Sequence, residues 1–165
     1  MLEVDIQRAV GVILQSVAVA DGKTIDLKLP AGVEDGTQMR LAGKGEEGPG
    51  GHGDALVTIQ VQPHAFFRRD GDDIRLDLPI GIDEAVSGAK IRVPTVDGAV
   101  MLTVPAGSSS GKTLRLKGRG FSAKGGLRGD QLVTLEIVLP DDITELANRL
   151  EGWQDGSLHR SKLGV

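Results

Sequence analysis

Residues 30–45 read PAGVEDGTQMRLAGKG, and residues 105–120 read PAGSSSGKTLRLKGRG. The two stretches share Pro-Ala-Gly, a central Gly, Arg-Leu and a closing pair of glycines, each 75 positions apart. Further matches at a spacing of 76 join Asp21-Gly22 to Asp97-Gly98, and Gly53-Asp54 to Gly129-Asp130. Such self-similarity at a nearly constant spacing is the signature of tandem copies of one structural unit. We therefore predict two copies of one domain, over residues 1–70 and 71–141.

Each copy has the pattern of β-strands. Ile25, Leu27 and Leu29 alternate with polar residues, as do the apolar residues of 57–61, 74–80, 100–104 and 133–139. The Asp-Gly pairs at 21–22 and 97–98 lie between such runs and predict hairpin turns. The 24 glycines and 7 prolines favour short strands and tight turns over long helices. The expected fold is mainly all-β, with two tandem repeated β-sandwich-like domains, short helices and a C-terminal helix.

The end of the chain, residues 142–165, differs from both copies. Asp142 and Glu145 form an Asp-x-x-Glu capping pattern, and Gly152 is placed to end a helix. Ile143, Leu146, Ala147 and Leu150 follow at helical spacing, which predicts a helix over about 142–151 with one apolar stripe. Because so short a helix is marginal alone, the stripe must pack on the second domain's own sheet or on a second chain.

Composition excludes several classes of protein. The net charge of −4 argues against a general nucleic-acid binder, which needs a basic surface. There is no Cys, so disulfides and thiolate metal sites are excluded. No apolar run approaches the roughly 20 residues of a membrane helix. The start of the chain lacks the pattern of a secretion signal, so we expect a cytoplasmic location.

The motifs that carry chemistry all favour structural readings. The glycines around Gly43-Lys44-Gly45 lack the following Ser or Thr of a phosphate-binding loop. The acidic run 70–73 has Gly81 where a calcium loop needs Glu, so a turn is expected. Asp54 and Asp130 are related by the repeat, which favours a shared role in binding turn amides. We therefore expect no enzyme, no cofactor and no metal site.

Apolar residues of the first domain suggest a binding surface. Val4 and Ile6 occupy alternate positions, and so do Val17 and Val19. They either face the core of their domain or form a shallow groove with an open strand edge, where an extended peptide adds as another strand.

Several motifs resemble those of a known family. Residues 63–73, PHAFFRRDGDD, resemble the signature that joins the two C-terminal domains of DnaJ-type co-chaperones. Residues 30–36, PAGVEDG, and residues 93–98, VPTVDG, resemble further parts of those domains, and the likeness runs from about Val4 to Leu150. The chain has no His-Pro-Asp tripeptide, no Gly/Phe-rich linker and no Cys-x-x-Cys pair. It therefore resembles the simpler class without a zinc finger, which includes curved-DNA-binding relatives, reduced to its substrate-binding half.

The resemblance implies a function and partners. Such domains bind extended hydrophobic segments of unfolded client proteins for a DnaK-type chaperone, which the full-length protein recruits, and they form homodimers. By position, the client site maps to Val4, Ile6, Val17, Val19 and Phe67. The dimerisation contact would involve Ile143, Leu146 and Leu150.

Other features leave alternatives open. Family members dock the acidic tail of the partner chaperone on basic residues near position 15, where this chain has Gln15, which puts that docking in question. A DNA-associated module and a purely structural dimerisation unit are alternative functions. Because Met1-Leu2 leads directly into a family strand, we also expect a fragment of a longer protein.

Overall fold

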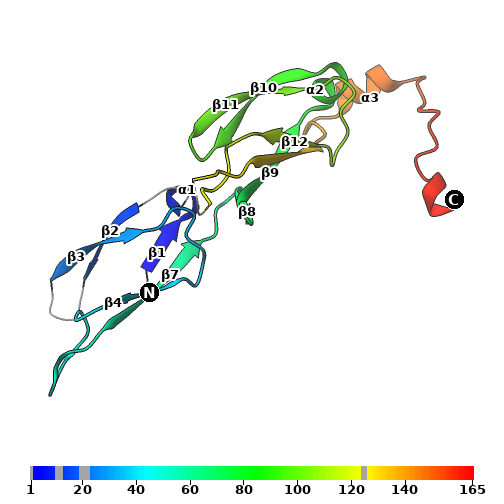
Figure 1. The fold of residues 1–165 in the computed structure, drawn as a ribbon. Helices are drawn as coiled ribbons and strands as arrows, with labels where there is room; N and C mark the ends of the chain where they lie inside the picture. The colour runs from blue at the N-terminus through cyan, green and yellow to red at the C-terminus, as the bar shows by residue number, and fades with distance from the viewer. Residues whose placement is uncertain (1, 10–12, 19–22, 124–125) are drawn as a thin grey trace.

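The computed structural model describes residues 2–9, 13–18, 23–123 and 126–165. Figure 1 shows two β-rich repeats that follow one another along an elongated molecule, with a short helix beyond the second repeat. The fold is mainly β, and each repeat has a larger sheet, a two-stranded sheet and a short helix. The predicted all-β fold of two tandem domains is confirmed.

The elements that the two repeats share follow one another in the same order, and each repeat also has short strands of its own. The first repeat is formed by β1 (Leu2–Asp5), α1 (Ile6–Ala9), β2 (Ile13–Ala18), β3 (Thr24–Leu29), β4 (Gln38–Leu41), β5 (Glu47–Gly48), β6 (Gly51–His52) and β7 (Ala55–Gln62). The second is formed by β8 (Arg68–Asp70), β9 (Asp73–Ile80), α2 (Ile82–Ser87), β10 (Ala89–Thr95), β11 (Gly98–Val104), β12 (Thr113–Leu116) and β13 (Gln131–Ile137). The chain ends with α3 (Thr144–Leu150) and a 3-10 turn, η1 (Ser161–Leu163).

The larger sheets of the two repeats have equivalent strand orders. β1, β7 and β4 are neighbours in the first repeat, and β9, β13 and β12 are neighbours in the second, where β8 adds a fourth strand. The parallel pairs also share one register, since Leu2 lies opposite Ile59 and Leu78 lies opposite Leu135. β2 and β3 form an antiparallel pair, as do β10 and β11. The sequence repeat is therefore a repeat of topology and of register.

Alternation along the strands builds the core. In β9, Ile74, Leu76, Leu78 and Ile80 are all buried, because successive side chains of a strand point to opposite faces. The predicted alternation from 133 to 139 holds only in part, since β13 ends at Ile137 and the side chain of Leu139 is 64% exposed.

Two aspartates hold the glycine turns of the repeats. The backbone N–H of Gly43 donates to Asp54 Oδ1 at 2.9 Å, and that of Gly118 donates to Asp130 Oδ1 at 2.7 Å. The Gly43 N–H and the Arg40 guanidinium hold the pKa of Asp54 below its usual value. The predicted structural role of Asp54 and Asp130 is confirmed.

Arg69 joins the two repeats. Its side chain donates from Nη1 to the carbonyl of Val33 at 2.7 Å and from Nη2 to the carbonyl of Gly32 at 2.8 Å. The same guanidinium lies 4.1 Å from the centre of the Phe121 ring in the second repeat. Its strand, β8, pairs with β9, so residues 68–70 belong to the sheet of the second repeat although the predicted boundary follows residue 70.

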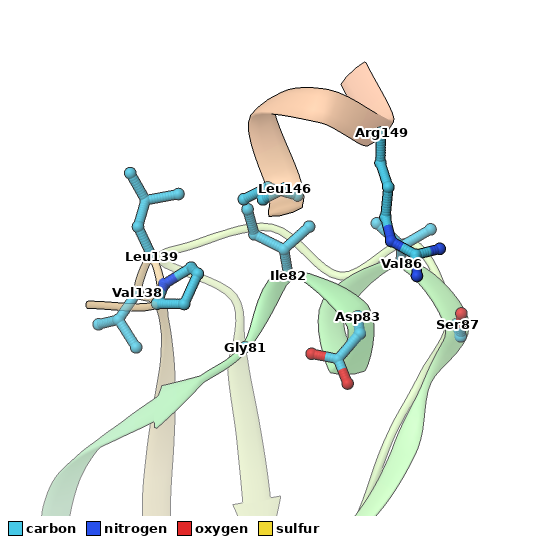
Figure 2. A pocket seen from close by; sticks show the side chains of 10 residues that line it. Gly81, Ile82, Asp83, Val86, Ser87, Val138, Leu139, Leu146 and Arg149 are labelled. Carbon is cyan, nitrogen blue, oxygen red and sulfur yellow. The ribbon is translucent and has the colours of Figure 1, made fainter. Parts of the chain in front are cut away.

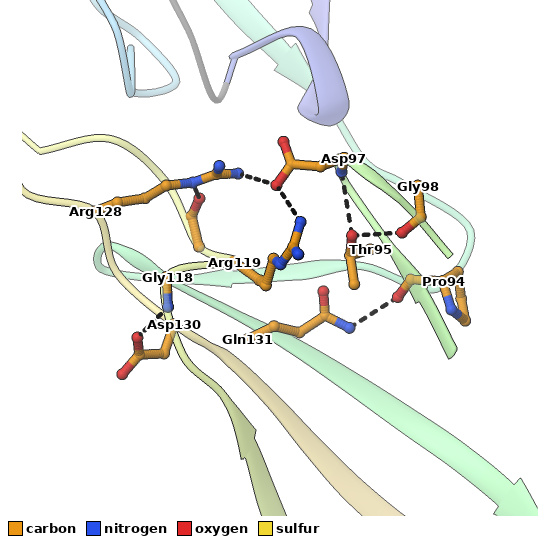
Figure 3. A network of polar contacts seen from close by, with 10 residues as sticks. Pro94, Thr95, Asp97, Gly98, Gly118, Arg119, Arg128, Asp130 and Gln131 are labelled. Atoms are coloured by element: carbon orange, nitrogen blue, oxygen red, sulfur yellow. Dashed lines mark hydrogen bonds and ion pairs between the residues drawn. The ribbon is translucent and has the colours of Figure 1, made fainter. Parts of the chain in front are cut away.

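A polar network fastens the β10–β11 hairpin to its own repeat (Figure 3). Asp97, at the tip of the hairpin, forms ion pairs with Arg128 at 2.8 Å and with Arg119 at 3.4 Å. Below it, the buried amide of Gln131 donates to the carbonyl of Pro94 at 2.9 Å. The hairpin that Asp97-Gly98 predicts is observed, with Val96 and Asp97 in the turn and Gly98 at the start of β11. Its counterpart at 21–22 lies outside the described residues.

The C-terminal helix is shorter than predicted. It begins after Ile143 and ends at Leu150, and Asp142 accepts the backbone N–H of Thr144 at 2.9 Å instead of capping through a pair with Glu145. Glu145 binds Arg149 one turn later at 2.6 Å. Gly152 then adopts a φ of 78°, which ends the helical segment.

Candidate functional site

A hollow of about 290 Å³ opens in the first repeat, at its end nearest the second. Its apolar wall contains Ile6 from α1, Val61 from β7 and Phe67 from the segment that follows β7. Pro63 and His64 form one side of the hollow. The hollow thus lies beside β1, an edge strand of the described three-stranded sheet, which ends one residue before Ile6.

His64 shapes the turn that delivers the aromatic residues. Its Nδ1 accepts the backbone N–H groups of Phe66 and Phe67, each at 3.2 Å. The imidazole centre lies 4.5 Å from the Phe66 ring and 4.7 Å from the Phe67 ring. The side chain therefore satisfies two backbone donors, as a capping residue does at the start of a helix, and also packs on both rings.

Phe66 and Phe67 face different surroundings. Phe67 is 1% exposed and belongs to the core, whereas Phe66 is 43% exposed. Their ring centres lie 4.6 Å apart in an edge-to-face arrangement. The pair therefore connects the core to the surface, with the Phe67 ring buried and the Phe66 ring exposed to solvent.

The structure brings together three of the predicted client-site residues. Val4, Ile6 and Phe67 are all buried in one hydrophobic cluster, and Ile6 and Phe67 line the hollow. Val17 lies in β2 with its backbone opposite Ile25. Val19 lies outside the described residues, so the complete five-residue site stays a prediction.

Sequence reasoning missed the rim of the hollow. Val61, Pro63 and His64 line it, and the exposed Phe66 ring packs edge-to-face against His64. One signal was available in the sequence, because Phe66-Phe67 places two of only three phenylalanines side by side, directly after Pro63-His64. That signal marks the segment but does not show which ring is exposed.

Charged side chains at this end of the repeat are already engaged. Asp35 Oδ1 accepts the N–H of Val61 at 2.8 Å, which ties the loop before β4 to the hollow. Arg68 makes two hydrogen bonds of 3.0 Å to Asp77, and this contact raises the pKa of Arg68 and lowers that of Asp77. The hollow is consequently an apolar depression bordered by charged groups that already have hydrogen-bond partners.

The second repeat has a larger hollow at the equivalent place (Figure 2). It measures about 710 Å³, and Ile82, Val138 and Leu139 line it at positions that correspond to Ile6, Gln62 and Pro63 of the first repeat. Figure 2 shows α3 lying across this opening, with Leu146 and Arg149 directed toward it. The apolar lining gives Leu146 a contact within its own chain.

The predicted dimerisation residues divide into two groups on α3. Leu146 is half-buried over the hollow, whereas Ile143 is 52% exposed and Leu150 is 45% exposed. Val86, Val138 and Leu139 are also exposed at this end of the molecule. Leu146 therefore packs over the hollow of the second repeat, whereas Ile143 and Leu150 stay exposed to solvent.

Two absences hold for the part of the chain that the structure describes. No group of three or more His, Cys, Asp or Glu residues there could hold a metal ion. No helix among these residues is long and apolar enough to cross a membrane.

A family model decides what this pair of repeats is. The model of the DnaJ C terminal domain matches residues 2–140, which covers both repeats. The chain belongs to the DnaJ C-terminal domain family. The resemblance drawn from the sequence motifs is thereby confirmed, and both hollows lie within the matched region except where α3 closes the second.

Relatives of known name support the same family. The chain is 47% identical over 131 residues to a protein named Chaperone protein DnaJ from Geobacillus thermodenitrificans, a match that covers 78% of the chain and 34% of that relative. It is 44% identical over 123 residues to Chaperone protein DnaJ 2 from Mycolicibacterium paratuberculosis, covering 73% of the chain and 31% of the relative. The chain thus spans about a third of the length of these DnaJ proteins.

Proposed function

We propose that this chain is the client-binding part of a DnaJ-type co-chaperone. It would hold extended hydrophobic segments of unfolded polypeptides in the first-repeat hollow, for transfer to a DnaK-type chaperone in the cytoplasm. The observation that carries the proposal is the apolar hollow between Ile6, Val61 and Phe67, beside an edge strand, in a chain of the DnaJ C-terminal domain family. Binding of this kind requires no catalysis and no cofactor.

The dimensions of the hollow suit weak and permissive binding. Ligand pockets typically measure about 300–1,000 Å³, so a hollow of about 290 Å³ accepts one or two side chains and not a folded surface. Burial of about 100 Å² of apolar area contributes about 2.5 kcal/mol. A client would gain further affinity by adding its backbone to an edge strand, which is independent of side-chain identity.

Removing the exposed ring should weaken client capture without unfolding the chain. Phe66→Ala is expected to raise the dissociation constant for a fluorescein-labelled, reduced and carboxymethylated α-lactalbumin about five- to tenfold, because a half-exposed aromatic side chain loses about 1 kcal/mol of contact. Fluorescence anisotropy measures the change. Met101→Ala, which removes an exposed apolar side chain from β11 in the second repeat, is the matched control and should bind like the parent. Equal affinities of Phe66→Ala and the parent would place the client elsewhere.

A DNA-associated role is the alternative that the family leaves open. The net charge of −4 and the pI of about 5.4 weigh against it, since DNA binding depends on cationic contacts with phosphates. The two functions respond differently to salt. Affinity for the labelled client should change little between 50 and 500 mM NaCl, whereas DNA binding would fall steeply over that range.

We also propose a homodimer through the exposed part of α3. Ile143 and Leu150 present exposed apolar surface, as do Val138 and Leu139 shortly before α3 in the chain. A two-fold contact that covers these side chains would place two client sites in one particle. The polar residues beyond Trp153 limit the contact to the helix and its neighbourhood.

A charge on α3 tests the dimer. Leu150→Asp should raise the dimer dissociation constant at least about tenfold, because the contact would bury an unpaired carboxylate. Asn148→Asp adds the same charge to an exposed polar position of α3 and is the control. Sedimentation equilibrium over a hundredfold range of concentration measures both variants. A monomeric parent throughout that range would refute the dimer.

A further inference from the structure

His64 occupies a special place in the proposed client site. Its ring packs against both the core ring, Phe67, and the exposed ring, Phe66, and its Nδ1 is the acceptor for the backbone N–H groups of both residues. The side chain also lines the hollow itself. One imidazole thus determines how the turn is closed and where both aromatic rings lie.

This geometry requires one protonation state. Neutral imidazole has one nitrogen that accepts hydrogen bonds, whereas in protonated imidazole both nitrogens are donors. A proton on Nδ1 would therefore place a donor against the two N–H groups that it now satisfies. Both contacts of 3.2 Å would be lost, and the turn that presents Phe66 and Phe67 would have to open.

We propose that His64 is the positioning residue of the client site and makes client binding sensitive to acid. Neutral His64 holds the exposed Phe66 ring against its own ring and holds Phe67 in the wall of the hollow. Protonation removes this support, so the chain would hold clients at neutral pH and release them in mild acid. The release of clients in acid rests on the proposed function, whereas the response of the turn to pH does not.

The groups that face the hollow do not replace the lost contacts. Asp35 is bound to the N–H of Val61, Arg68 is paired with Asp77, and Arg69 donates to Gly32 and Val33. The two arginines place positive charge beside the imidazole, while Asp35 places a negative charge there. The second repeat has Pro140 at the position equivalent to His64, so it lacks a histidine that could hold the turn in this way.

Two variants separate the acceptor from the ring. In His64→Asn, the side-chain oxygen can accept the same N–H groups and does not titrate, whereas His64→Ala removes the acceptor at every pH. His52→Asn and His159→Asn are the controls, because both histidines are exposed and lie outside the hollow.

The experiment measures the turn and the client separately between pH 7.5 and pH 5.5. Proton–nitrogen correlation spectra follow the amides of Phe66 and Phe67, and anisotropy of labelled carboxymethylated α-lactalbumin follows client affinity. In the parent, both amides should shift together as the pH falls from 7.5 to 5.5, and affinity should fall about tenfold, the effect of losing two neutral hydrogen bonds. His64→Asn should show neither change, His64→Ala should bind weakly at both pH values, and the controls should behave like the parent.

The outcomes distinguish this inference from the proposed function. Amides of Phe66 and Phe67 that do not respond to acid in the parent, or that respond equally in His64→Asn, would overturn the role of His64. A response of the amides in a parent that binds no client at either pH would support the role of His64 in the turn and refute the client-binding function.

Discussion

Phe67→Ala should lower the free energy of unfolding by about 3–5 kcal/mol, the usual cost of removing a fully buried phenylalanine. Phe67 is 1% exposed and packs on the rings of His64 and Phe66, so its removal leaves a cavity directly under the proposed client site. Small domains are stable by only about 5–15 kcal/mol, so this loss is a large part of the total. Urea denaturation followed by circular dichroism measures it.

Phe66→Ala is the matched control for this measurement. It removes the same side chain from the neighbouring position, where the ring is half-exposed, and should cost less than about 1.5 kcal/mol. If the two variants were equally stable, Phe67 would not be the core anchor of the hollow. Phe67→Leu retains most of the buried volume and shows whether client binding needs the aromatic ring or only a filled core.

Gly32→Ala should lower the free energy of unfolding by about 3 kcal/mol or more, and Gly107→Ala, at the equivalent position of the second repeat, should lower it less. Gly32 and Gly107 occupy the same position in the two repeats, with φ values of 67° and 73°. Alanine pays about 1–2 kcal/mol for this left-handed conformation at either site. A Cβ on Gly32 would also lie 2.0 Å from the carbonyl oxygen of Ser122, whereas a Cβ on Gly107 would have no neighbour within 4 Å among the described residues.

The difference between the two variants reports on the joint between the repeats. Because Ser122 belongs to the second repeat, relief of the overlap must separate the repeats and disturb the bond from Arg69 to the Gly32 carbonyl. Small-angle X-ray scattering should therefore show a changed shape for Gly32→Ala and an unchanged one for Gly107→Ala. Equal loss of stability in both variants, with identical scattering, would mean that the contact between Gly32 and Ser122 is absent in solution.

Local pattern in the sequence was sufficient for the fold. The 75- or 76-residue spacing predicted two units, and alternation such as Ile74, Leu76, Leu78 and Ile80 identified buried strand faces. Repetition and alternation are both properties of residue spacing along the chain, so they can be recognised without tertiary information. The roles of Asp54 and Asp130 followed from the repeat for the same reason.

The contact between the repeats and the geometry of the first-repeat hollow could not be predicted from the sequence. The bonds from Arg69 to Gly32 and Val33 join residues 36 and 37 positions apart, and no periodicity marks them. The His64 contacts are local, but a histidine two residues before a phenylalanine does not indicate which nitrogen faces the backbone. The exposure of Leu139 arises because β13 ends before the alternating pattern does.

Mapping a bound client onto the chain tests whether the first-repeat hollow holds it. Isotope-labelled chain is titrated with an unlabelled extended peptide rich in leucine and phenylalanine, and amide shift changes are recorded at pH 7.5. If the client binds in the first-repeat hollow, the largest amide shift changes should occur at β1, at Ile6 and across Val61–Phe67. The changes should saturate, and Phe66→Ala should lower the affinity for the peptide. Changes confined to α2, α3 and residues 138–140, with none around the first-repeat hollow, would contradict binding there.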